Sequence, residues 1–173
     1  MKFVLGAFLV VACTGSNANK AQVGARPPAN TAWGLEVGAD YLTYQKLTAE
    51  PFLSAVHGDR LVNVYVSRNA AEAYLSGGEI PVNGTIVKDS FDNEKGQPGA
   101  AGPVFVMQKR APGYAPEHGD WYYGFYWANP TGKFAGKPLA WQGKDAGVTY
   151  CIECHDSYDR GLGGLVPSSQ LMR

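Results

Sequence analysis

The pattern of polar and apolar residues, together with β-branched residues and turn signals, predicts four β-strands in the middle of the chain, at residues 59–66, 85–91, 103–109 and 121–128. The first alternates as a strand with one solvent-exposed face does. Residues 92–102 are expected to form a loop. Ser67 is expected to cap a short helix over residues 68–75, which Gly77 and Gly78 end.

The first twelve residues have the pattern of an export signal, because Lys2 precedes a short apolar run that is not long enough to cross a bilayer. Residues 10–13 (Val-Val-Ala-Cys) match a bacterial lipobox. We therefore expect residues 1–12 to be a lipoprotein signal peptide and Cys13 to carry lipid. The alternative is an ordinary signal peptide that is cut at another bond, and both predict export.

Residues 13–32 are mostly small and polar and contain no aromatic side chain, which is typical of a flexible tether. We expect one folded domain at residues 33–173, beginning at Trp33. Fifteen basic and fifteen acidic residues give a formal net charge of zero, which argues against nucleic acid or an acidic membrane surface as the main partner. A hydrophobic content of 45% excludes wholesale disorder.

Cys151, Cys154 and His155 form the pattern C-x-x-C-H, which is the attachment sequence for c-type haem. In such a site two thiols add to the vinyl groups of the porphyrin, and the imidazole binds the iron. Helical spacing places these three positions on one side, so a single turn presents them together. We therefore expect one covalently bound haem c, attached at both cysteines, with His155 as the axial ligand.

Three other kinds of site fit part of this pattern. A thioredoxin-like redox pair normally begins a βαβ unit, whereas this pair comes late in the sequence. A zinc site needs a fourth ligand, which His57 or His118 can supply. A disulfide between Cys151 and Cys154 closes too small a loop to stabilise much. None of the three explains both the histidine and the export signal.

The late position of the motif bears on the second axial position of the iron. Met172 is the only methionine that follows His155, in a segment expected to be frayed. A distal ligand therefore comes from upstream or is absent, and we favour an open position that binds a small molecule. His57 and His118 lie beside glycines in predicted loops, and we expect both on the surface.

Residues 121–127 hold six aromatic side chains in seven positions. In a strand the odd-numbered residues share one face, and Tyr122, Gly124 and Tyr126 share the other. One interpretation is a central strand that is buried on both faces. The other is that one face also forms a wall for the porphyrin, with Gly124 leaving room for close approach.

Four blocks of sequence together resemble the cytochrome P-460 family over roughly residues 57–155. They are residues 84–88 (Gly-Thr-Ile-Val-Lys), 102–107 (Gly-Pro-Val-Phe-Val-Met), 112–121 (Pro-Gly-Tyr-Ala-Pro-Glu-His-Gly-Asp-Trp) and the C-x-x-C-H motif. The resemblance implies an α+β fold, mainly antiparallel β-sheet with packed helices, in which haem is held by the C-terminal motif. It also implies a five-coordinate haem iron that interacts with small nitrogen species such as hydroxylamine or nitric oxide.

In catalytic members of that family a lysine is bonded to the porphyrin edge, and Lys88 looks like its match. A buried amine loses its proton more easily and becomes a nucleophile, although a solvent-facing position is the commoner outcome for lysine. Those members also move protons with a distal carboxylate, where this sequence has Met107 or Gln108. A relative, cytochrome c-prime-beta, binds nitric oxide beneath apolar side chains, and Phe91, Phe105 and Met107 are candidates for such a distal pocket.

These features leave three hypotheses for the function. The first is a haem enzyme that oxidises hydroxylamine or detoxifies nitric oxide, the second a nitric-oxide-binding module, and the third a six-coordinate electron-transfer cytochrome with Met107 or another upstream ligand. The expected partners are a small nitrogenous ligand, a redox partner cytochrome and, as a further hypothesis, a second copy of the chain. We expect the protein on the periplasmic side of a bacterial membrane, touching it only through the lipid on Cys13, or otherwise soluble in the periplasm.

Overall fold

The computed structural model describes residues 33–158, 161–162 and 166–172. The expected signal peptide at residues 1–12, the lipidation site Cys13 and the tether at residues 13–32 lie outside the described residues. Trp33 is buried in an aromatic cluster with Tyr41 and Tyr126. Within these described ranges no helix has the length and apolar character needed to cross a membrane.

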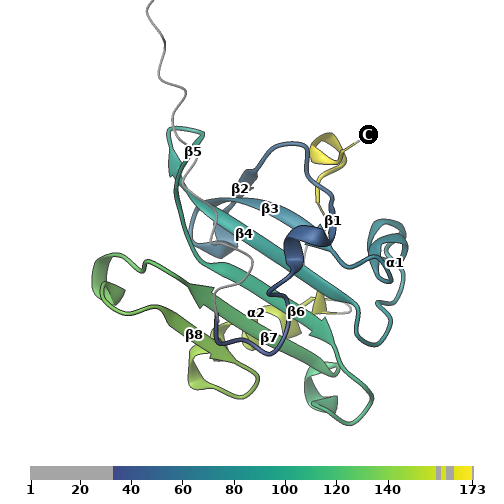
Figure 1. Cartoon of the computed structure of the whole chain (residues 1–173). Helices are drawn as coiled ribbons and strands as arrows, with labels where there is room; N and C mark the ends of the chain where they lie inside the picture. Colours follow the sequence, from purple (N-terminus) through teal and green to yellow (C-terminus); the bar gives the residue numbers. More distant parts are fainter. Residues whose placement is uncertain (1–32, 159–160, 163–165, 173) are drawn as a thin grey trace, which may run out of the picture.

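An antiparallel sheet of eight strands forms the body of the described chain (Figure 1). Its main path runs in the order β1 (Gln45–Lys46), β3 (Arg60–Val66), β4 (Thr85–Glu94), β6 (Val104–Lys109), β7 (Trp121–Trp127) and β8 (Leu139–Gln142). Off this path, β2 (Phe52–Ser54) pairs with β3, and β5 (Gln97–Ala101) pairs with β4. The described residues form two α-helices, both short, α1 (Ala71–Ser76) and α2 (Thr149–Asp156). The expected α+β class with a mainly antiparallel sheet is therefore confirmed.

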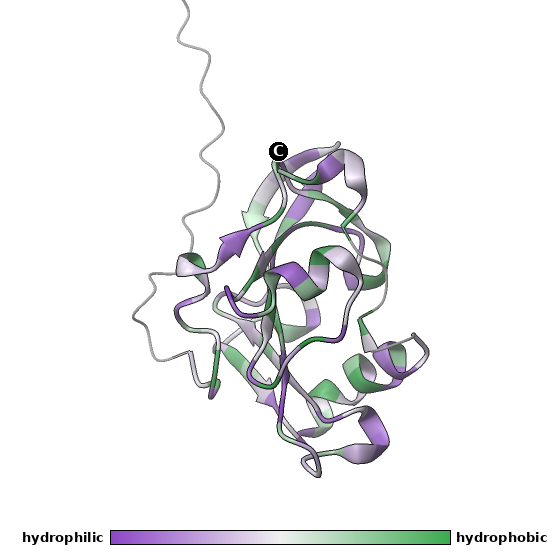
Figure 2. Cartoon of the chain, turned by 90° about the vertical axis from the view of Figure 1, so that its right-hand side faces the viewer, coloured by the Kyte–Doolittle hydropathy of each residue, from purple (hydrophilic) through white to green (hydrophobic). Residues whose placement is uncertain are grey.

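Both faces of the sheet are covered, because side chains that alternate along the central strands enter two separate hydrophobic cores. Ile86, Met107 and Tyr123 belong to the core that also contacts Cys151 and Ile152 of α2. Their sequence neighbours enter the second core, which contains Tyr41 of the 3-10 helix η1 (Tyr41–Thr43). Figure 1 shows α2 behind the sheet and η1 in front of it, and Figure 2 shows the hydropathy of the residues from a view turned by 90°.

This two-sided cover corrects one prediction and confirms another. Strand β3 does not have a solvent-exposed face, since every residue after Arg60 is buried. Its polar residue Asn63 is buried because it donates a hydrogen bond from Nδ2 to Asp89 Oδ1, at 2.9 Å. Strand β7 is a central strand buried on both faces, which is the first of the two interpretations of its aromatic pattern.

The expected loop at residues 92–102 is wrong, because β4 continues to Glu94 and forms a hairpin with β5. Glu94 pairs with Gln97, so the turn consists of Lys95 and Gly96, whose φ angles are 56° and 88°. Positive φ at both central residues is the geometry that fits the twist of a two-residue hairpin. Asn93 also supports the turn, since its Oδ1 accepts a hydrogen bond from the backbone N–H of Gly96 at 2.7 Å.

The predicted helix after β3 exists but begins three residues later, at Ala71, with Ala70 as its N-cap. Ser67 does not cap it, because its Oγ accepts the backbone N–H of Thr85 at 2.8 Å and its hydroxyl lies 2.7 Å from Asn69 Oδ1. Ser67 therefore ties the end of β3 to the start of β4. Gly77 ends the helix in the left-handed conformation, as predicted.

Candidate functional site

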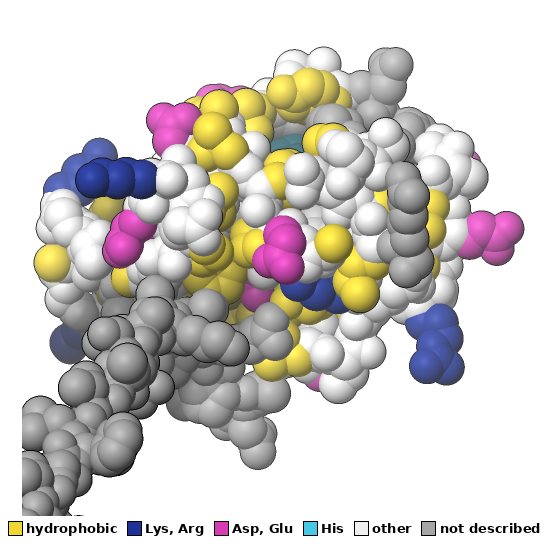
Figure 3. Space-filling view, turned by 90° about the horizontal axis from the view of Figure 1, so that it is seen from above, with side chains coloured by type: hydrophobic (Ala, Val, Ile, Leu, Met, Phe, Trp, Pro, Cys, Tyr) yellow, Lys and Arg dark blue, Asp and Glu magenta, His cyan; other side chains and the backbone are white. Residues whose placement is uncertain are grey.

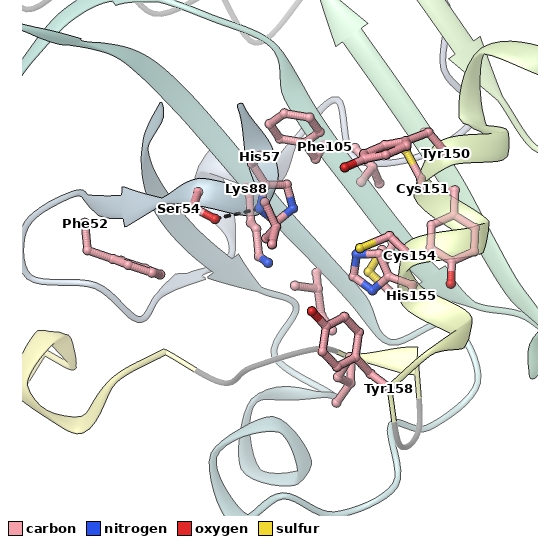
Figure 4. Close-up of a pocket in the computed structure, with 18 of the residues that line it drawn as sticks. Phe52, Ser54, His57, Lys88, Phe105, Tyr150, Cys151, Cys154, His155 and Tyr158 are labelled. Atoms are coloured by element: carbon pink, nitrogen blue, oxygen red, sulfur yellow. Dashed lines mark hydrogen bonds between the residues drawn. The ribbon is translucent and has the colours of Figure 1, made fainter. Parts of the chain in front are cut away.

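The three side chains of the C-x-x-C-H motif all line one cavity (Figure 4). They come from α2, as the sequence predicted, and both thiols are free. Val148, which is fully buried just before the helix, anchors its first turn in the core. Tyr150 is 68% exposed and rims the cavity.

The cavity measures about 300 Å³ and is enclosed by four parts of the fold: the β2–η2 segment, the central strands, α2, and the residues that follow α2. Its lining residues are Phe52, Leu53, Ser54, Ala55, Val56, His57, Ile86, Lys88, Phe105, Val106, Met107, Tyr123, Gly124, Tyr150, Cys151, Cys154, His155, Tyr158, Leu162 and Pro167. Leu53, Val56 and Tyr158 are exposed at its rim. Seen from above, the molecule carries such exposed hydrophobic side chains between acidic and basic ones (Figure 3).

The imidazole of His155 is held in one tautomer. Its Nδ1 lies 2.6 Å from the carbonyl oxygen of Gly161, and because a carbonyl only accepts, Nδ1 must carry the proton and donate it. The lone pair is then on Nε2, which is the arrangement that a metal-binding histidine needs. Burial lowers the pKa of His155, so the ring stays neutral. The ring of Tyr123 packs beside it, with centroids 5.5 Å apart.

The thiols share this apolar environment. Desolvation raises the pKa of Cys151 to about 11, so it is a protonated thiol near neutral pH. Its partner Cys154 is one helical turn away and also lines the cavity. The described residues hold no group of three or more His, Cys, Asp or Glu side chains arranged to bind a metal ion, so the zinc alternative finds no fourth ligand there.

Lys88 reaches the same cavity from β4. It lies in a row across the sheet, paired with Val64 on one side and Phe105 on the other, on the face that α2 covers. The solvent-facing alternative is therefore wrong, since the side chain is partly buried in the cavity wall. Desolvation lowers the pKa of Lys88 from 10.5 to about 8, so a substantial fraction of the amine is neutral near that pH.

Of the three residues expected in a distal pocket, two line the cavity and one does not. Phe105 and Met107 point into it from β6. Phe91 is buried, but it is three residues from Lys88 and therefore lies on the opposite face of β4, where it pairs with Leu61. Phe91 is thus not part of the site.

The structure also shows where three other residues named in the sequence analysis lie. Gly124 lines the cavity, but a Cβ there meets Leu35 at 3.1 Å in the second core, so the room it leaves is on the far side of the sheet. Gln108 donates from Nε2 to Thr85 Oγ1 at 2.9 Å and does not line the cavity. Met172 has a 56% exposed side chain, and its backbone N–H donates to the carbonyl oxygen of Leu47 at 2.8 Å, so this segment is not frayed there.

Of the two remaining histidines, His57 differs from the expected surface position, whereas His118 is partly exposed, as expected. His57 lines the cavity and is not a surface residue, because the 3-10 helix η2 (Ala55–His57) turns its ring inward onto Phe105. His118 lies in a second cavity, with Nδ1 2.6 Å from Asp156 Oδ2. The position of His57 could not be read from a periodic pattern, because η2 is too short to show one.

Comparison with known proteins places this geometry in a family. The family model described as Cytochrome P460 matches residues 39–160, which is more than half of the chain and includes every strand and the motif helix. Comparison with curated proteins finds no match to the chain. The chain belongs to the cytochrome P460 family and is a haem protein of that family.

Proposed function

We propose that one haem is attached covalently at Cys151 and Cys154, with Nε2 of His155 as its axial iron ligand. The observation that carries this proposal is that two free thiols and a neutral imidazole with an available Nε2 face a single apolar cavity. Each thiol adds its sulfur and its proton across one vinyl group, so attachment needs no oxidant. The bound haem supplies an iron that binds small molecules and exchanges electrons.

The residues present fit such a group. The walls facing α2 are built largely from apolar side chains, which exclude water. One atom of the cavity wall is polar and unpaired: the hydroxyl of Tyr123 is buried and has no hydrogen-bond partner among the described residues, which is unusual for a phenol in a core. A polar atom left unpaired at a cavity wall is consistent with a partner that binds there.

We further propose that the second axial position is open and binds or oxidises small nitrogen species such as nitric oxide or hydroxylamine. Phe105 and Met107 make this part of the wall apolar, and no aspartate or glutamate is found among the described lining residues. That composition favours ligand capture more than proton-coupled oxidation, which needs a proton acceptor. Lys88 is the candidate for a covalent bond to the porphyrin edge, since its neutral amine is the nucleophilic form. This bond replaces one N–H of the amine and one C–H of the porphyrin, which is a two-electron oxidation, so we propose that it forms with a peroxide as the oxidant, which is reduced to water.

A second candidate function is electron transfer through a six-coordinate haem. It is favoured by Met107, whose thioether lines the cavity and is a ligand type that cytochromes use. Optical spectra of the ferric and ferrous holoprotein separate the two candidates. A high-spin, five-coordinate spectrum supports the open site, whereas a low-spin spectrum in both states that Met107→Leu abolishes supports electron transfer and overturns the open site.

The bond to Lys88 is tested by mass spectrometry of the digested holoprotein. We expect a fragment containing Lys88 to remain attached to the haem peptide of Cys151 and Cys154. Lys88→Met removes that fragment, while Lys109→Met, in the neighbouring strand but outside this cavity, leaves it in place. A haem peptide that never carries a Lys88 fragment refutes the cross-link and leaves the axial and thioether assignments standing.

Export and lipid attachment are also part of the proposal and rest on the sequence of residues 1–13. We expect the protein to fractionate with membranes of the expressing bacterium and to leave them when Cys13 is replaced by serine. A small nitrogenous ligand and a redox partner cytochrome remain the proposed partners. Release of unlipidated wild-type protein into the periplasm contradicts the anchor but not the export.

A further inference from the structure

A polar pair, Ser54 and His57, faces the haem-binding helix from the opposite wall of the cavity (Figure 4). Ser54 ends β2, and η2 follows it directly, so the two side chains are three residues apart on one tight turn. Gly58 closes this turn in the left-handed conformation, with φ 81°. The turn therefore fixes where the imidazole points.

The orientation of the His57 ring is set by two contacts. Its Nδ1 lies 2.7 Å from Ser54 Oγ, and its ring meets Phe105 edge-on with centroids 4.8 Å apart. The atom left over is Nε2, for which the described residues provide no hydrogen-bond partner. Apart from Ser54 and Lys88, the side chains beside it on this wall are apolar, so His57 is a rare polar group there.

Burial also fixes the charge of this imidazole. Desolvation, with Lys88 and His155 as further causes, lowers the pKa of His57 to about 3. A neutral ring carries one N–H and one lone pair. When the Ser54 hydroxyl donates to Nδ1, the proton is on Nε2 and is available to a molecule in the cavity.

We propose that His57, oriented by Ser54, donates a hydrogen bond from Nε2 to the small ligand bound in this cavity. The inference rests on the proposed open iron site and adds to it the residue that polarises the ligand. It gives the chain a polar group at a wall that has no carboxylate among its described residues. Ser54 is a positioning residue, because it acts through His57 by selecting the tautomer.

Carbon monoxide bound to the ferrous holoprotein is the probe, and its infrared C–O stretch is the readout, because a hydrogen bond to the ligand lowers this frequency. We expect His57→Phe to raise the frequency and His57→Gln, which retains an N–H donor, to restore part of the shift. Ser54→Ala raises it to a smaller extent, since it frees the other tautomer. The matched control is His118→Phe, a histidine outside this cavity, which leaves the frequency unchanged.

Ferric azide affinity gives the same test in equilibrium form. Loss of one hydrogen bond to a charged ligand corresponds to a decrease on the order of tenfold in affinity for His57→Phe. An unchanged C–O frequency and unchanged azide affinity in His57→Phe overturn the inference while the open site stands. Carbon monoxide uptake by His57→Phe but not by the wild type shows that His57 binds iron itself and also overturns it. No uptake by any variant overturns the proposed open site and the inference together.

Discussion

Replacing Lys88 with methionine tests whether the amine of Lys88 is buried in the apolar wall of the cavity. The experiment uses haem-free protein in the Cys151→Ser/Cys154→Ser background, which lacks the two thiols of the proposed haem attachment, so Lys88 keeps a free amine. Burial lowers the pKa of Lys88 to about 8, whereas the unfolded chain keeps the ordinary value of 10.5. The unfolded chain therefore binds more protons between pH 8 and 10.5, and the stability of the folded state rises with pH through that window.

The size of the effect follows from the two pKa values. At about 1.4 kcal/mol per pH unit, the buried charge destabilises the folded state by about 3 kcal/mol at pH 7 and by about 1 kcal/mol at pH 10. Other cavity groups do not interfere, because the pKa of His57 is lowered to about 3 and burial raises that of Tyr123 far above the window. Added apolar packing by methionine shifts the stability by the same amount at every pH.

Urea unfolding at pH 7, 8, 9 and 10 measures this change. We expect Lys88→Met to be more stable than its parent at pH 7, and the advantage to shrink by about 2 kcal/mol at pH 10. Lys109→Met is the matched control, because it removes a lysine from the next strand outside this cavity. Stability curves of Lys88→Met and its parent that run parallel from pH 7 to 10 would refute the buried position of the amine.

Three further substitutions test the surroundings of the site. Tyr123→Phe in the haem-free background raises the free energy of unfolding by about 1 kcal/mol, because it removes a buried hydroxyl without a partner among the described residues; a loss of stability in urea unfolding contradicts this. Gly147→Ala lowers it by about 1–3 kcal/mol, since the new Cβ overlaps the ring of Trp141; an unchanged urea midpoint counts against this packing. Gly161→Ala strains a residue whose φ is +66° and whose carbonyl accepts the hydrogen bond from His155. We therefore expect the reduction potential of the holoprotein to change. An identical potential argues against a role of that hydrogen bond in tuning the iron.

The sequence alone predicted the features that depend on short-range pattern. The helix at the C-x-x-C-H motif and the central strands follow from local spacing and alternation, and both are present. The same period of two puts Lys88 on one face of β4 and Phe91 on the other, so the error at Phe91 was avoidable from the sequence. The burial of Lys88 could not be inferred in this way, because it depends on which face α2 covers.

The features that were missed depend on tertiary contacts or on segments too short for a pattern. Strands β1, β2 and β8 have two to four residues, which is too few to establish alternation. The β4–β5 hairpin was not predicted from the sequence, because its turn has Lys95 in the left-handed conformation, where asparagine or glycine is the usual signal. His57 lies next to Gly58 in what resembles a surface loop, and only the path of β2 brings it to the cavity.

The most direct test of the account is whether haem is bonded to the motif helix. The protein is produced in a host that matures c-type cytochromes, denatured, extracted with acidified organic solvent and digested for mass spectrometry. We expect the pigment to stay with the protein, and the peptide that spans Cys151 to His155 to carry the mass of one haem. Pigment that passes entirely into the solvent, or a motif peptide with two unmodified thiols, would contradict the account.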